Sequence, residues 1–157
     1  MKKTDIYKGF EGYNAYPLAE AEKMIRSRIL AAFNELVGQL EGCEQKAGSM
    51  RMLWILEHIT VLKRRMERMR NQIKERDEIF IPVYLKARIA RVDEEKLKKI
   101  DHRLMEVIGL SLEIINTLSC AETDSRIGDK FAKISDYLRE MEANCQERAL
   151  ILKKEVF

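Results

Sequence analysis

The stretch from Met52 to Phe80 constrains the fold of this chain more than any other. Its apolar residues recur at steps of three and four, the coiled-coil-like spacing of one face of an α-helix. Members of this line are Met52, Ile55, Ile59, Leu62, Met66, Met69, Ile73 and Phe80. The apolar face is broad in the first half, whereas a single apolar line runs between basic residues in the second half. The pattern predicts a long helix that enters a core at one end and meets a different environment at the other.

Composition favours an all-α protein with one domain. The chain has 157 residues, of which 46% are hydrophobic and 35% charged, with only seven Gly and two Pro. Few helix breakers and repeated three-four spacing are typical of helical proteins, and this length suits one core. No apolar run approaches the ~18 residues of a membrane span. Because no signal peptide is visible and the three cysteines form no CxxC pair, we expect a cytoplasmic protein.

Periodicity and helix-end signals predict four helices after an aromatic N-terminal arm. Pro17 suits a first helical turn, Gly42 and the polar stretch after it predict a helix end, and Ser49 is a candidate N-cap for the next helix. Pro82 is expected to kink or stop that helix near Ile81. The expected segments are an arm at 1–16 and a single helical domain at 17–157, with helices at 17–43, 50–78, 94–119 and from 125 to near the C-terminus.

The links between these helices are short, which favours an antiparallel up-down-up-down four-helix bundle. The helices expected at 50–78 and 94–119 both change from a broad to a narrow apolar face midway. Antiparallel pairing would match the broad halves with each other and the narrow, charged halves with each other. We therefore expect these two helices to lie side by side, either within the bundle or as a projecting hairpin.

The narrow apolar line of the same two helices predicts self-association. Charged flanks leave little apolar width for the core of a monomer at this level, so a second copy or another helical protein would complete it. The leading hypothesis is a non-enzymatic interaction or assembly protein. Residues assigned to its oligomer or partner seam are Met66, Met69, Ile73, Phe80, Leu97 and Ile100.

A basic block is the basis of an alternative hypothesis, a bundle that binds nucleic acid. The chain has a net charge of +3, yet residues 63–103 hold fourteen Lys or Arg against eight Asp or Glu. Such residues could contact phosphates, although the acidic residues between them favour pairing along the helix surface. Candidate anion or nucleic-acid contacts are Lys63, Arg64, Arg65, Arg68, Arg70, Arg76, Lys86, Arg88 and Arg91.

Catalytic, metal and cofactor motifs are not found in the sequence. The two histidines, His58 and His102, belong to no Glu-x-x-His pair and would lie ~15 Å apart along the expected bundle axis. Cys43, Cys120 and Cys145 lie in no nucleophile elbow, and no Gly-rich phosphate loop occurs. We therefore expect neither an enzyme nor a cofactor. Cys43 and Cys120 fall at the same expected end of the bundle.

Overall fold

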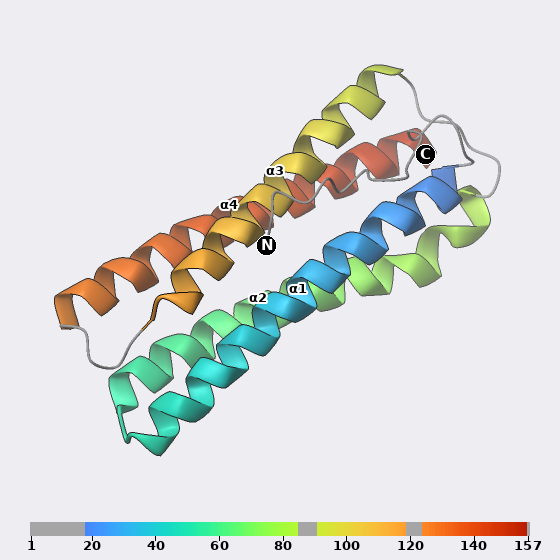
Figure 1. The fold of residues 1–157 in the computed structure, drawn as a ribbon. Helices are drawn as coiled ribbons and strands as arrows, with labels where there is room; N and C mark the ends of the chain where they lie inside the picture. Colours follow the sequence, from blue (N-terminus) through green and yellow to red (C-terminus); the bar gives the residue numbers. More distant parts are fainter. Residues whose placement is uncertain (1–17, 85–90, 119–123, 157) are drawn as a thin grey trace.

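The computed structural model describes the backbone of residues 18–84, 91–118 and 124–156, and the side chains of 20–74, 93–118 and 125–153. Over these ranges the chain forms four α-helices and no strand, which confirms the predicted all-α class (Figure 1). The predicted arm at 1–16 lies outside the described residues. The helices are α1 (Leu18–Ser49), α2 (Leu53–Tyr84), α3 (Arg91–Asn116) and α4 (Asp124–Val156).

Each helix contributes one apolar face to a shared core. On α1 the residues at three-four spacing are completely buried, as the sequence predicts. The same holds for the inward line of α4, which includes Ile134, Leu138 and Met141. The fully buried residues of the α1 line are Ile25, Ile29, Phe33, Leu36 and Leu40.

None of the described helices is long and apolar enough to cross a membrane.

The order of helices around the core differs from the prediction. Helix α1 packs against α2 and α3, and α4 packs against α3 and α2. Over the described residues α2 and α3 make no close backbone contact, so these two helices lie diagonally across the core and not side by side. Figure 1 shows the two hairpins, α1–α2 and α3–α4, as two layers. The predicted pairing was wrong because apolar periodicity shows which face of a helix is buried but not which helix covers it.

Two predicted helix ends also differ from the structure. Helix α1 continues through Gly42 to Ser49, so Ser49 ends one helix and does not cap the next. Within this extension Ala47 is buried and Glu44 accepts hydrogen bonds from α2. Helix α2 continues past Pro82 to Tyr84. Proline disrupts only the preceding turn of a helix, and here that turn lies at the end of a 32-residue helix.

The turn between α1 and α2 has the hydrogen bonds of a Schellman motif. The Met52 N–H donates to the Ala47 carbonyl at 3.0 Å, and the Arg51 N–H donates to the Gly48 carbonyl at 3.1 Å. Arg51 has a φ of 56°, a left-handed conformation that costs an L-residue about 1–2 kcal/mol. Glycine is the usual residue at this position, so the turn carries a local strain that the surrounding contacts hold in place.

Replacing Arg51 with glycine is expected to stabilise the protein. The side chain is exposed, so the variant loses little packing and removes the left-handed strain, with an expected gain of about 0.5–1 kcal/mol. Urea unfolding followed by circular dichroism measures this free energy. Gln39→Gly, at an exposed position within α1, is the control and should destabilise by about 1 kcal/mol. A loss of stability in Arg51→Gly would contradict the assignment of strain to Arg51.

Candidate functional site

The predicted oligomer seam lies mainly in the core of the single chain. Met66, Met69 and Ile73 on α2 are at most 6% exposed, and Leu97 and Ile100 on α3 are also at most 6% exposed. The side chain of the sixth seam residue, Phe80, lies outside the described side chains. Since these residues are already covered by the chain's own helices, a charged substitution such as Met66→Lys would be expected to unfold the protein.

The charged flanks explain why a narrow apolar line is sufficient on α2. Lys63, Arg65 and Arg70 are half-buried, so their aliphatic stems can widen the apolar face while their charged heads reach neighbouring helices. Lys63 Nζ donates to Glu44 Oε1 on α1 at 2.8 Å, and Arg70 Nη1 donates to Asn34 Oδ1 on α1 at 3.3 Å. The flanks of α2 therefore belong to its contacts within the chain.

The predicted nucleic-acid contacts are divided between internal partners and solvent. Lys63, Arg65 and Arg70 bind side chains of α1 or α4, whereas Arg64 and Arg68 are exposed on the outer side of α2. The remaining candidates, Arg76, Lys86, Arg88 and Arg91, lie outside the described side chains. Among the described residues, the structure thus leaves two of the five predicted basic side chains pointing outward.

Arg65 marks a groove between α2 and α4. Its Nε and Nη2 donate to Glu142 Oε1 at 3.3 and 3.2 Å, and its Nη1 donates to Ser135 Oγ at 3.2 Å. The groove encloses about 200 Å³, and Arg68 and Gln72 extend it onto the outer surface of α2. The carboxylate of Glu142 offsets the charge of Arg65, which leaves Arg68 as the cation that faces solvent in the groove. The residues that line the groove are Arg65, Arg68, Met69, Gln72, Ile73, Glu142, Cys145 and Gln146.

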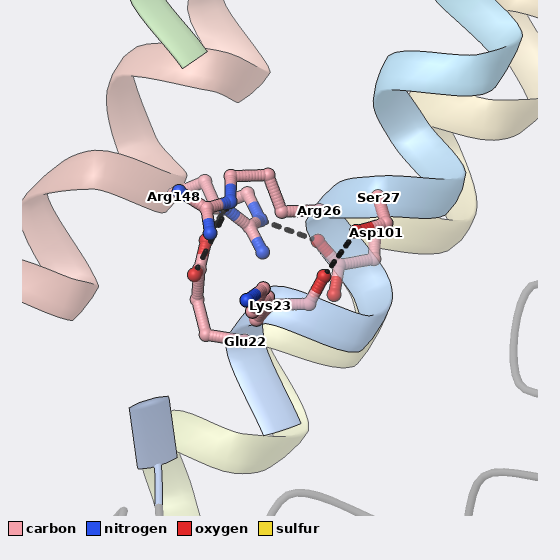
Figure 2. A network of polar contacts seen from close by, with 6 residues as sticks. All are labelled: Glu22, Lys23, Arg26, Ser27, Asp101 and Arg148. Atoms are coloured by element: carbon pink, nitrogen blue, oxygen red, sulfur yellow. Dashed lines mark hydrogen bonds and ion pairs between the residues drawn. The ribbon is translucent and has the colours of Figure 1, made fainter. Parts of the chain in front are cut away.

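A buried ionic cluster joins α1, α3 and α4. Figure 2 shows Arg148 of α4 reaching between Glu22 of α1 and Asp101 of α3. Arg148 Nη1 donates to Glu22 Oε1 at 3.1 Å and Nε donates to Asp101 Oδ1 at 2.9 Å, while Arg26 lies 3.5 Å from Glu22 Oε2. All four side chains are less than one-tenth exposed. Two carboxylates and two guanidinium groups balance in charge, as buried ions require.

Sequence reasoning missed this cluster, although the three-four spacing carried a signal. Arg148 lies three residues after Cys145 and four before Leu152 on α4, so it occupies the inward line of that helix. Asp101 likewise lies four residues after Leu97 and three before Leu104. A charged residue at a core position of one helix needs an opposite charge on another, and only the tertiary structure shows which residue provides it.

Large apolar side chains are exposed at the α1–α2 turn and along the outer side of α2. Met50 is 53% exposed, Leu53 70% and Val61 55%. Leu53 and Val61 lie on the same side of α2 as Glu57, Arg64 and Arg68, which are also exposed. We call these five residues the α2 outer stripe. It lies opposite the buried line of the same helix, so a partner could contact it without any change in the core.

His58 lies in an aromatic cluster between α2 and α4. The His58 ring packs against Trp54 and Phe131, with centroid distances of 5.7 and 5.3 Å. No group of three or more His, Cys, Asp or Glu side chains with metal-binding geometry occurs among the described residues. Cys145 is buried, and Cys120, which the sequence places at the same end of the bundle as Cys43, lies outside the described residues.

Comparisons with known proteins were made at the level of family models, curated sequences and solved structures. No family model, curated protein or solved structure matches this chain.

Breaking the buried ionic cluster is expected to destabilise the fold strongly. Asp101→Asn leaves the buried Arg148 without a full negative charge beside Nε, and removal of one partner of a buried ion pair costs about 3–5 kcal/mol. Asp136→Asn is the matched control, because Asp136 pairs with Arg139 at 3.4 Å where both side chains are more than 70% exposed. This control should change the free energy of unfolding by less than about 1 kcal/mol. Equal effects of the two variants in urea unfolding would rule out a structural role for the buried pair.

The Glu44–Lys63 pair predicts a pH-dependent contribution to stability. The hydrogen bond from Lys63 holds the pKa of Glu44 below its ordinary value of 4.5, and the same bond raises the pKa of Lys63 above 10.5. The contribution of Glu44 is therefore complete above pH 4.5 and is lost as the pH falls through its lowered pKa. That of Lys63 is lost only as the pH rises through its raised pKa.

Comparison of Glu44→Gln with the wild type tests this contribution. At pH 7 the wild type should be more stable by at most about 1 kcal/mol, as for a partly exposed pair, and the difference should close as the pH falls below 4.5. Urea unfolding at a series of pH values measures this difference in the free energy of unfolding. Glu35→Gln, at an exposed position on α1, is the control. A difference that stays constant down to acid pH would show that the ion pair is not its source.

Proposed function

We propose that this chain is a non-enzymatic interaction protein that self-associates through the outer surface of the first half of α2. The supporting observation is the exposure of Leu53 and Val61, at 70% and 55%, beside the exposed Met50 of the preceding turn. Large apolar side chains gathered on one surface mark sites of protein contact. The surface differs from the seam predicted by sequence, since the described seam residues of α2, Met66, Met69 and Ile73, are buried within the chain.

We take the four helices to form one bundle in which successive helices alternate in direction. The contacts of α1 with α2 and α3, and of α4 with the same two helices, support this arrangement. So does the buried cluster, which joins the beginning of α1 to the end of α4 through Glu22 and Arg148. In such a bundle each helix keeps one face toward solvent, and on α2 that face carries the α2 outer stripe.

Nucleic-acid binding through the basic block has less support. Lys63, Arg65 and Arg70 use their charged groups within the chain, and the outward pair Arg64 and Arg68 lies beside Glu57 and Glu67. Affinity for a nucleic acid grows with the number of phosphates neutralised. Among the described side chains of the block, two outward guanidinium groups beside carboxylates supply little of that affinity, so self-association remains the proposal.

The double variant Leu53→Gln, Val61→Gln tests self-association. Both side chains are exposed, so neutral polar replacements should keep the helix content seen by circular dichroism. Size exclusion with light scattering, over a range of concentrations, should show a wild-type mass that rises above 18.4 kDa and a double variant that remains monomeric.

Leu150→Gln provides a matched control, because Leu150 is 67% exposed on α4 and lies far along the helix axis from Val61. This variant should associate as the wild type does. A wild-type mass of 18.4 kDa at every concentration would refute the proposed function.

A further inference from the structure

The α2 outer stripe has a charge order that fits a copy of itself. We propose that two copies dock their α2 helices antiparallel about a two-fold axis near Val61. This arrangement rests on the self-association proposed above. Glu57 of each copy then faces Arg64 of the other.

The stripe lies on one face of the helix. With 3.6 residues per turn, the positions of Leu53, Glu57, Val61, Arg64 and Arg68 fall within about 80° of arc. All five side chains are exposed, while the buried residues Ile59, Leu62 and Met66 occupy the opposite side. A partner helix can therefore contact the whole stripe at once without disturbing the core.

Two-fold symmetry then matches unlike charges. In a two-fold interface a contact between one residue and a second is repeated with the copies exchanged. If α2 is centred between residues 60 and 61 and paired with an antiparallel copy, Glu57 lies opposite Arg64 twice. A parallel pair in register would place Glu57 against Glu57 and Arg64 against Arg64, which charge repulsion disfavours. The charge order thus selects the antiparallel arrangement.

The same register provides apolar contacts at the centre and at both ends. Val61 lies next to the two-fold axis and meets its copy there. Leu53, which is 70% exposed, lies opposite Arg68, whose aliphatic stem can cover it while the guanidinium remains in water. Each apolar residue of the stripe therefore loses exposed area in the dimer.

The expected dimer is weak and depends on salt. From residue 53 to residue 68 the stripe is about 23 Å long at 1.5 Å per residue, and one helix pair of this length belongs to the small class of protein interfaces. Exposed ion pairs are screened by salt. Association should therefore increase with concentration and decrease as the salt concentration rises.

Charge exchange tests the arrangement with the full chain. Glu57→Arg places Arg against Arg in its own dimer, and Arg64→Glu places Glu against Glu. We expect each variant alone to associate at least about tenfold more weakly than the wild type, because two pairs change from attraction to repulsion. An equimolar mixture of the two variants restores unlike charges at both pairs, and we expect it to regain association within about threefold of the wild type.

Sedimentation equilibrium at low and high salt measures the dissociation constants of the wild type, of each variant and of the mixture, and circular dichroism confirms that both variants keep their helices. Asp136→Arg on α4, an exposed charge reversal outside the stripe, is the control and should associate as the wild type does. Restoration only in the mixture cannot result from misfolding of either variant.

Each other outcome decides against the arrangement. If Leu53→Gln, Val61→Gln prevents association while the two charge variants do not weaken it, self-association stands and the antiparallel Glu57–Arg64 pairing is refuted. If the wild type is monomeric at every concentration, both the self-association and the antiparallel pairing are refuted. A single-stranded oligonucleotide provides the last comparison. If the mass rises only when the oligonucleotide is added, and the rise is larger for Glu57→Arg and smaller for Arg64→Glu, the stripe is a nucleic-acid site.

Discussion

Burial of the broad apolar face of α1 is the interaction on which the rest of the fold depends. This helix contacts α2 along one side and α3 along the other, and Ile25, Phe33 and Leu40 along its length are completely removed from water. Because one helix serves two neighbours, α2 and α3 can lie diagonally across the core. The broad face of α1 is wide enough to cover two neighbours, and the contacts show that these neighbours are α2 and α3.

The buried cluster of Glu22, Arg26, Asp101 and Arg148 adds specificity to this apolar contact. Apolar surfaces are non-directional and tolerate sliding, whereas a buried carboxylate separated from its guanidinium is costly. A shift of α4 by one turn against α1 and α3 would separate Arg148 from both carboxylates. The cluster therefore favours one register of the three helices, even if a well-packed apolar replacement would give similar stability.

The narrow apolar line of α2 has a different meaning once the neighbours are known. Lys63, Arg65 and Arg70 extend that line with their stems and bind side chains of α1 or α4. Over residues 53–74, where the side chains of α2 are described, its inward side is covered within one chain, and the side that faces solvent is the outer one. There Leu53 and Val61 alternate with Glu57, Arg64 and Arg68, an order of apolar and charged residues that suits contact between two helices.

The sequence by itself determined the helical class, the four helices and most buried positions, because apolar spacing at three and four residues depends only on helix geometry. It did not determine the end of α1, where Glu44 is held by Thr60 and Lys63. Nor did it show which helices are neighbours or that Arg148 meets Glu22 and Asp101. Those features depend on contacts between residues far apart in the chain, and local periodicity shows which face of a helix is buried but not what buries it.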